Sequence, residues 1–574
     1  MRVKRHYVSV GERLVHFRSV GAGPAVLLLH QSPQSSAAMI PLAEKLKSKH
    51  CVIAPDSPGF GLSDRLPMET PTIEDIADAL DEFTDAIQLP PATVIGVHTG
   101  AEIALEFGLR YPEKVTFLIL DGLALFTEQE SEDILEHYLP PFTPRWDGSH
   151  LTWLWARLRE QAIFFPWYKK NPAARMHYDM PDADYIHGWF MDFMYAGDNY
   201  RGGYGAAFRY RNSASIKDVT RPAAALYRTG DVLQPHQQRL PPLPKHAWTE
   251  TIPPGADNLD NRIIELLDER VLGNQADWRY EHLTSRTGTM PEPGYISLGE
   301  QQVAVITTGN PERPALLLLH DLAGSAISAG ELIVTLADEY HVICPDLPGH
   351  GESTDIATAG FSIETTVAAL SELLAVVGKS ACHLLSLGSS CVFIPPLIKH
   401  NPEIHIKAGM HNPLLLDASI RDAMQDRFAL PIEPDEYGTH ITKLWYALRD
   451  NRLFWPWYEP LAANIRHNPP SLAAEDIHQS LFDALRCGNL YQQIWQAFFA
   501  TDVMNDIRTL PLTVTMSKTH PCHETVLAAL IQLPTVTWKE TGDDWSEIAS
   551  GHFSISRPKG LKGSGRTLHT KECL

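Results

Sequence analysis

The sequence predicts an α/β protein made of two tandem domains, each with a mostly parallel sheet flanked by helices and carrying a helical cap. Three observations predict this fold class. The chain has 574 residues, too many for one hydrophobic core, because single cores stop growing near about 250–300 residues. Short apolar segments alternate with amphipathic ones, as strands and helices do in α/β proteins. Motifs of the first half also recur in the second half.

The recurring motifs keep one spacing along the chain. The run PAVLLLH that ends at His30 matches PALLLLH ending at His320, 290 positions later, and VIAPDSPGFG matches VICPDLPGHG at the same spacing. FFPWY and FWPWY repeat it again further along. One constant spacing predicts an internal duplication with domains at residues 1–272 and 294–574. The polar segment 273–293, which ends in Pro and Gly, is the predicted linker.

In the first half, the predicted strands are short, apolar and bounded, like strands buried on both faces of a parallel sheet. They lie at Val26–His30, Val52–Asp56, Thr93–Val97, Phe117–Asp121 and Ala223–Arg228. Amphipathic segments at Ile73–Ile87 and Ala101–Arg110 predict helices between them. A stretch from about 123 to 221, rich in Trp, Phe, Tyr and Pro, predicts a mostly helical cap, and its partner runs from about 413 to 510.

The composition predicts a cytoplasmic protein without nucleic-acid or membrane partners. Lys and Arg number 48 against 69 Asp and Glu, a net charge of −21, and such a surface repels phosphate backbones. No apolar run reaches the roughly 18 residues of a membrane span, and the N-terminus has no signal-peptide core. No phosphate-binding or dinucleotide fingerprint and no spaced metal-ligand cluster is present. We therefore expect a small-molecule partner and no metal or cofactor.

Two loop motifs resemble those of the α/β-hydrolase superfamily. His30-Gln-Ser-Pro33 stands where the capped haloalkane dehalogenase and epoxide hydrolase branch carries a His-Gly-x-Pro loop. DSPGFGLSD, residues 56–64, is close to the D-x-P-G-x-G-x-S-D of that branch. The resemblance implies a G-x-S-x-G elbow that holds a nucleophile, an acid after the strand that follows the cap, and a late histidine.

In the first half, the elbow is Gly-Val-His-Thr-Gly at residues 96–100, so His98 holds the nucleophile position. Asp231 fits the position of the acid, whereas Pro-Gly-Ala-Asp at 254–257 replaces the late histidine. The resemblance therefore implies that His98 acts as base or nucleophile, with Asp231 or Asp121 holding its tautomer.

In the second half, Leu-Leu-Ser-Leu-Gly at residues 384–388 aligns with the elbow and puts Ser386 in the nucleophile position. His552 lies in a Gly-His-Phe turn like that of the family, but His520 stands where the acid belongs. An acyl-enzyme hydrolase built on Ser386 would thus need another acid. The nearby candidates are Glu540, Asp543 and Asp544.

The resemblance also implies an oxyanion hole made of backbone N–H groups. The donors would be those of Ser32 and Thr99 in the first half, and those of Leu322 and Leu387 in the second. The family's closing amphipathic helix is predicted at Asn261–Asp268, but the polar, glycine-rich segment after Pro558 shows no counterpart.

The first functional hypothesis is a cofactor-free enzyme of the hydrolase fold, active in the first domain on a small, partly apolar ester, lactone or carbonyl compound. Proton abstraction from carbon, as in a lyase or isomerase, is open to the same histidine. The alternatives are a hydrolase dependent on Ser386, or a protein that binds a ligand or partner without turnover. A fused duplicate is also expected to pack its halves as a pseudo-dimer.

Overall fold

In the computed structural model, the chain divides into two compact units, Met1–Thr143 with Thr152–Thr284, and Pro144–Leu151 with Ser285–Cys573. Each unit is described by itself. The structure describes residues 2–177, 179–211, 216–270, 278–280, 291–353, 360–379, 381–403, 405–467, 469–517, 520–542, 547–548 and 552.

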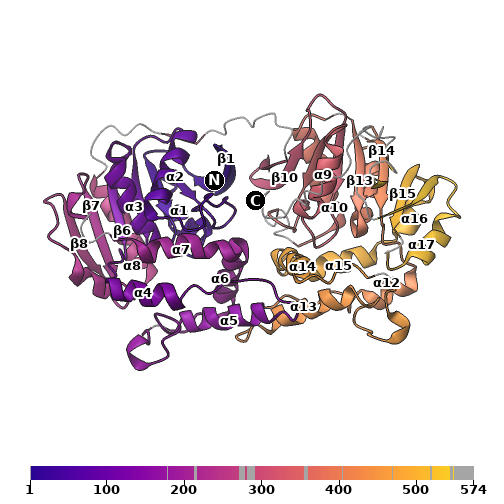
Figure 1. Cartoon of the computed structure of the whole chain (residues 1–574). Helices are drawn as coiled ribbons and strands as arrows, with labels where there is room; N and C mark the ends of the chain where they lie inside the picture. Colours follow the sequence, from indigo (N-terminus) through magenta and orange to yellow (C-terminus); the bar gives the residue numbers. More distant parts are fainter. Residues whose placement is uncertain are drawn as a thin grey trace. The chain divides into compact units, whose positions relative to one another are not determined.

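The first unit contains an eight-stranded sheet (Figure 1). Its strands are β1 (Lys4–Val10), β2 (Arg13–Val20), β3 (Ala25–Leu29), β4 (Cys51–Pro55), β5 (Ala92–Val97), β6 (Val115–Asp121), β7 (Ala223–Arg228) and β8 (Ala247–Ile252). The spatial order is β1-β2-β4-β3-β5-β6-β7-β8. Only the pairings of β2, with β1 and with β4, are antiparallel. From β4 to β8 the strands are parallel, so their carboxyl ends meet at one edge.

Helices cover both faces of this sheet. They are α1 (Ile40–Leu46), α2 (Ile73–Ala86), α3 (Thr99–Arg110) and α8 (Ala256–Arg270). Successive strand residues point to opposite faces, so Val94 packs in the core that α2 and α3 share, and Ile95 packs in the core that α1 and α8 share. Thr72 begins α2 with a capping box, in which its side chain accepts from the Asp75 N–H and the Asp75 carboxylate accepts from the Thr72 N–H.

Four helices between β6 and β7 form the cap of the first unit. They are α4 (Glu128–His137), α5 (Ser149–Gln161), α6 (Ala183–Ala196) and α7 (Tyr200–Arg209). Figure 1 shows α4, α6 and α7 gathered at one end of the sheet. Ser35, which follows β3, donates to the Asp192 carboxylate on α6 at 2.9 Å and ties the cap to the sheet.

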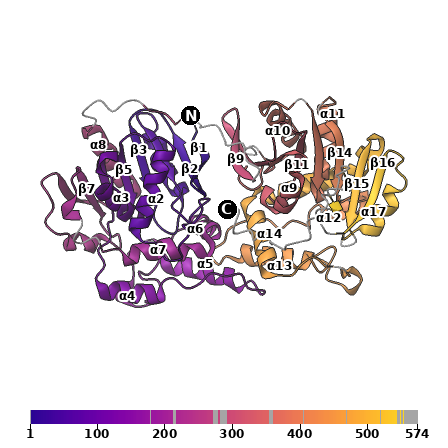
Figure 2. The same ribbon diagram turned by 45° about the horizontal axis from the view of Figure 1, so that its top comes forward.

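The second unit repeats this strand order (Figure 2). Its strands are β9 (Glu292–Leu298), β10 (Gln301–Thr308), β11 (Ala315–Leu319), β12 (His341–Pro345), β13 (Cys382–Leu387), β14 (His405–His411), β15 (Leu512–Ser517) and β16 (Val536–Thr541). The order is β9-β10-β12-β11-β13-β14-β15-β16, with antiparallel pairing again confined to β10. The match in order supports the duplication that the constant spacing predicts.

The helices of the second unit follow the same plan, with one local difference. They are α9 (Gly330–Leu336), α10 (Ile363–Val376), α11 (Ile394–His400), α12 (Ala418–Met424), α13 (Thr439–Asn451), α14 (Ala474–Arg486), α15 (Leu490–Ala500), α16 (Val503–Asp506) and α17 (His523–Leu530). After β13 the chain first makes a 3-10 turn, Gly388–Phe393, where α3 begins directly after the elbow in the first unit.

The structure confirms the predicted fold class, two mostly parallel sheets flanked by helices. Residues 278–280 and 291–293 of the predicted linker are described. Trp278 pairs with Gly23 through two hydrogen bonds of 3.1 Å, and β9 already begins at Glu292. The segment after Pro558, as well as Asp543 and Asp544, lies outside the described residues. Among the described helices, none is both long enough and apolar enough for a membrane span.

Candidate active site

The turn after β5 places His98 at the carboxyl edge of the first sheet. His98 precedes the first residue of α3 and has φ 47° and ψ −110°, a left-handed backbone that non-glycine residues seldom adopt. The two flanking glycines are required for close approach. A Cβ at Gly96 would lie 2.1 Å from the Gly100 carbonyl oxygen, and one at Gly100 would lie 2.2 Å from that of Leu29. The predicted elbow is therefore present, and it carries an imidazole.

The His98 ring faces a cation at the end of β7, Arg228, and an acid on the loop that follows, Asp231. Its Nε2 lies 3.3 Å from Asp231 Oδ2 and 3.4 Å from Arg228 Nη2. Gly122, at the end of β6, leaves room for the ring, because a Cβ there would lie 2.5 Å from His98 Cδ2. The side chain of His98 keeps 23% of its surface exposed, so solvent reaches it.

The Arg228 guanidinium forms ion pairs with two carboxylates near His98. Its Nη2 lies 3.1 Å from Asp231 Oδ2 and 3.2 Å from Asp121 Oδ2. Burial tends to raise the pKa of Asp231, but the neighbouring His98 and Arg228 outweigh it and hold that pKa well below its ordinary value. At Asp121 burial prevails over Arg228 and His98 and raises the pKa. Asp231 is thus the charged partner of His98.

Arg228 was not among the predicted site residues. It ends an apolar strand and stands three residues before Asp231, which is the one sequence signal that could have indicated it. Asp121, considered as an alternative orienter, contacts Arg228 with its carboxylate and accepts the His98 backbone N–H with its carbonyl oxygen at 2.8 Å. It therefore fixes the elbow backbone.

The predicted oxyanion donors of the first domain flank this turn. Thr99 opens α3, and Ser32 lies in the loop after β3. Within the described part of the chain, the backbone N–H of neither residue has a hydrogen-bond acceptor. The Gln31 side chain turns aside and donates to Gln34 Oε1 at 2.7 Å. Free N–H groups at a helix N-terminus suit an anion.

His30 holds the loop that carries Ser32. Its Nε2 accepts the Ser57 N–H at 2.9 Å, which leaves Nδ1 as the protonated nitrogen that donates to the Gln31 carbonyl at 3.0 Å. Burial lowers the pKa of His30 despite the nearby Asp56, consistent with this neutral tautomer. His30 therefore positions the loop.

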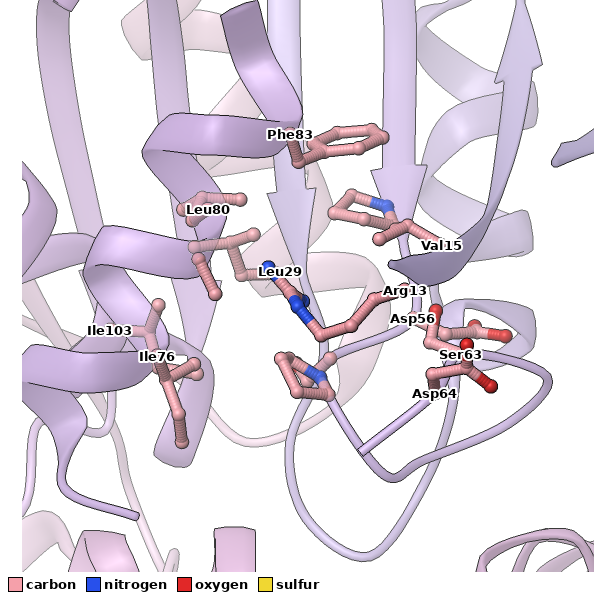
Figure 3. Close-up of a pocket in the computed structure, with 14 residues that line it drawn as sticks. Arg13, Val15, Leu29, Asp56, Ser63, Asp64, Ile76, Leu80, Phe83 and Ile103 are labelled. Atoms are coloured by element: carbon pink, nitrogen blue, oxygen red, sulfur yellow. The ribbon is translucent and has the colours of Figure 1, made fainter. Parts of the chain in front are cut away.

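Asp56 is a structural acid in the first domain. Its carboxylate accepts from His16 Nδ1 at 2.8 Å, from the Ser36 N–H at 2.7 Å and from the Leu62 N–H at 2.9 Å. Figure 3 shows it beside Ser63 and Asp64 at a small pocket whose lining is otherwise mostly apolar, apart from Arg13 and Ser57. The cavity there measures about 20 Å³, room for one water. It is too small for an organic substrate.

In the second domain the structure corrects the position of Ser386. Ser386 pairs with Leu319 as Gly96 pairs with Leu29, so it lies inside β13, two residues before the elbow. Gly388, with φ +56°, holds the elbow position. Ser386 is fully buried, and its Oγ makes no hydrogen bond to another described residue. The nucleophile position of this domain carries no side chain.

His552 is also displaced from its predicted role. Its Nδ1 lies 2.5 Å from where a Cβ of Gly409 would stand, and its Nε2 lies 2.7 Å from Thr515 Oγ1. Gly409 pairs with Leu385, and side chains alternate along a strand. His552 therefore lies on the face of the sheet toward which Leu385 points. Ser386, the next residue, points to the opposite face, so Ser386 and His552 do not form a dyad.

Of the remaining residues predicted for the second domain, some lie where they were predicted and others do not. His520 follows β15 as Asp231 follows β7, as predicted; burial lowers its pKa to about 4. Leu387 lies in β13 and is not an oxyanion donor. The donor beside Leu322 is instead Ser389: both N–H groups donate to Asp321 Oδ1, at 2.8 Å and 2.7 Å. Glu540 contacts His523 at 3.5 Å.

Comparison with known proteins identifies the fold. Residues 24–175 and 314–394 match a family described as the alpha/beta hydrolase fold. A 2-hydroxymuconate semialdehyde hydrolase of a Pseudomonas species is 30% identical over 187 residues, which are 30% of this chain and 65% of that protein. A cis-3-alkyl-4-alkyloxetan-2-one decarboxylase of Shewanella oneidensis is 31% identical over 127 residues, 21% of this chain and 40% of that protein.

A further curated relative and a solved structure also match parts of this chain. An uncharacterised protein of Mycobacterium tuberculosis is 32% identical over 104 residues, 18% of this chain and 30% of that protein. Among solved structures, the enol-lactonase of Burkholderia xenovorans aligns with 46% of this chain and 98% of its own, with 14% identity and a TM-score of 0.36. The chain thus spans less than two thirds of each of these curated relatives.

Proposed function

We propose that this chain is an enzyme of the α/β-hydrolase fold, the family that residues 24–175 and 314–394 match, and that its first domain is the catalytic half. In this proposal it hydrolyses a small, partly apolar ester, lactone or carbonyl compound, with His98 as general base. The observation that carries the proposal is the contact of His98 Nε2 with Asp231 Oδ2 at 3.3 Å, on an elbow whose neighbouring N–H donors are free. The relative named as a 2-hydroxymuconate semialdehyde hydrolase supports the reaction class.

Asp231 selects the tautomer of His98. A carboxylate repels the lone pair of an imidazole nitrogen and attracts its N–H, so Nε2 carries the proton. The lone pair is then on Nδ1, the nitrogen free to take a proton from water. When Nδ1 is protonated, the charged ring lies against the ionised Asp231, which stabilises it. Arg228 holds Asp231 in place through its contact at 3.1 Å.

The proposed reaction needs no covalent intermediate. His98 Nδ1 removes a proton from water, and the water oxygen bonds to the carbonyl carbon. The Ser32 and Thr99 N–H groups then stabilise the tetrahedral oxyanion. When the C–O bond to the leaving group breaks, His98 returns the proton to the departing oxygen. One water is consumed, and an acid and an alcohol, or a hydroxy acid from a lactone, are released.

A second reaction class has an observation in its favour. One relative is named as a decarboxylase of an oxetanone, so ring opening without net addition of water is a rival use of the same base. The Ser386 alternative loses support because Ser386 lies within β13 and has no exposed surface. Binding without turnover is the remaining alternative.

The test uses the full-length chain with p-nitrophenyl acetate and a panel of small lactones in isotopically labelled water. Hydrolysis puts the heavy oxygen into the acid product, whereas decarboxylation does not. His98→Ala should lower the rate by roughly 10²–10⁴, the usual contribution of a positioned acid–base group. Ser386→Ala, the matched control in the other domain, should retain the rate. Equal rates for wild type and His98→Ala, with a genuine substrate, would refute the proposal.

A further inference from the structure

The second domain holds a carboxylate at its elbow, and that carboxylate comes from its own chain. Asp321 directly follows His320, the counterpart of His30. Its Oδ1 accepts two backbone N–H groups, that of Leu322 at 2.8 Å and that of Ser389 at 2.7 Å. Leu322 and Ser389 occupy the places that Ser32 and Thr99 occupy in the first domain. The two oxyanion donors therefore converge on one oxygen of Asp321.

The elbow glycine makes this arrangement possible. A Cβ at Gly388 would lie 2.4 Å from Asp321 Cγ and 2.4 Å from Asp321 Oδ2, well inside contact distance. Any side chain at the nucleophile position would thus collide with the Asp321 carboxylate. The domain can have either a nucleophilic side chain at residue 388 or the Asp321 carboxylate between the two donors, but not both. This chain has the Asp321 carboxylate.

The first domain shows the opposite state. His98 occupies its elbow, and Gln31, which stands in the place of Asp321, donates to Gln34 at 2.7 Å. The His30 and His320 rings make matching contacts, since each Nδ1 meets the next carbonyl oxygen and each Nε2 accepts an N–H at 2.9 Å. Both loops are thus held alike, and the two domains differ in what fills the donor pair.

We propose that the oxyanion-binding site of the second domain is intact but closed by the Asp321 carboxylate, which acts as a built-in ligand and keeps this half non-catalytic. The site is one for a small carboxylate or similar anion, because two converging N–H donors at a backbone turn bind that group. This inference does not depend on whether His98 is a base.

The charge state of Asp321 agrees with the geometry. Part of the Asp321 residue is exposed, but enough protein atoms surround it for burial to raise its pKa to about 6. The Ser389 and Leu322 N–H groups oppose this effect. At pH 7.5 the group is mostly ionised and its Oδ1 is a charged acceptor. Charge-assisted bonds of this kind are about twice as strong as neutral ones.

The test removes the internal ligand and offers a replacement. Crystals of full-length Asp321→Ala and wild type are soaked in sodium acetate at pH 7.5. In the variant, acetate should occupy the place of the Asp321 carboxylate, with one oxygen in reach of the Leu322 and Ser389 N–H groups; in wild type, Asp321 should remain there. The proposal is overturned if the variant holds no acetate between these donors, or if acetate displaces Asp321 in wild type.

Two further variants keep the test decisive. Asp321→Gln introduces the residue that the first domain carries at this place, so it should fold even if the alanine variant does not, and it should admit acetate. Asp321→Asn keeps an oxygen acceptor of the same length and should exclude acetate. Acetate bound in Asp321→Asn but absent from Asp321→Gln would contradict the proposed role of the carboxylate.

Discussion

Asp231 Oδ2 lies 3.3 Å from His98 Nε2, although the two residues are separated by the whole cap. The parallel strands bring them together, because β5 ends just before His98 and β7 ends three residues before Asp231. Arg228 then holds the carboxylate from the other side. An insertion of about 100 residues between β6 and β7 leaves this pair intact, because strand pairing positions it.

The first prediction concerns Asp231→Asn. The amide keeps the size of the side chain but cannot stabilise a charged imidazole, and its NH₂ group can favour the wrong tautomer of His98. The rate with p-nitrophenyl acetate should fall by roughly 10²-fold or more, which is within the usual contribution of a correctly protonated acid–base group. The melting temperature should change little. A variant with unchanged kcat would contradict the role of Asp231 as orienter.

Gly122→Ala tests whether the position of the His98 ring matters. The new Cβ would lie 2.5 Å from His98 Cδ2, so the ring must move away from Asp231. Because a displacement of about 1 Å can cost roughly 10²-fold in rate, we expect a loss of activity of that order. The measurement is kcat/KM with the same ester.

Gly11→Ala is the matched control for Gly122→Ala. Gly11 has φ +61°, against +63° at Gly122, but a Cβ there meets nothing within 4 Å. Both variants therefore bear the strain of a left-handed alanine, about 1–2 kcal/mol, and only one displaces His98. Similar losses of activity in the two variants would show that backbone strain, and not ring placement, lowers the rate.

A fluorophosphonate probe tests the absence of a serine nucleophile. The reagent phosphonylates serines activated by a neighbouring base, and Ser386 is fully buried on the face opposite to His552. We therefore expect peptide mass spectrometry to find Ser386 unlabelled under conditions in which the chain hydrolyses its substrate. A labelled Ser386 peptide would restore the acyl-enzyme alternative and move the active site to the second domain.

The alternating pattern of apolar strands predicts the fold well. The predicted strand at Ala223–Arg228 has the bounds of β7, and the predicted helix at Ala101–Arg110 ends where α3 ends. Such strands are buried on both faces, so their composition alone indicates them. The pairing of the two halves as a pseudo-dimer stays a prediction, which scattering from two independently tumbling bodies would contradict.

The sequence predicts the parts of the site that depend on the backbone turn. It does not predict the parts that depend on which distant groups a side chain contacts. Two glycines around His98 indicate a tight turn, and the structure contains it. The local Ser-x-Gly pattern puts Ser386 at the elbow, whereas the constant spacing of 290 puts Gly388 opposite His98, and the strand pairing agrees with the spacing. No pattern reveals that Asp321 folds back onto two N–H groups, because that contact depends on the glycine 67 positions later in the chain.

The last prediction concerns the contact between cap and sheet and has a pH dependence. Asp192 on α6 accepts from Ser35 Oγ at 2.9 Å. Burial, opposed by the Ser35 hydrogen bond and by Arg18 but reinforced by Asp56, raises its pKa to about 7. An unfolded aspartate has a pKa of about 3.9. Between these two values the folded state binds more protons than the unfolded state, so the stability contributed by this group falls as pH rises.

Asp192→Asn should remove that loss, because an amide oxygen accepts from Ser35 without a charge to bury. The wild type and the variant should differ least near pH 4, where the folded Asp192 carboxyl is neutral and the unfolded aspartate is only about half ionised. At pH 8 the melting temperature of the wild type should be a few degrees below that of the variant, since about 1 kcal/mol corresponds to roughly 2–4 °C in a domain of this size. Calorimetry of both full-length proteins from pH 4 to 8 gives the comparison. Parallel curves would show that Asp192 does not titrate in this range, and a less stable variant at pH 8 would show that the ionised carboxylate strengthens the contact with Ser35.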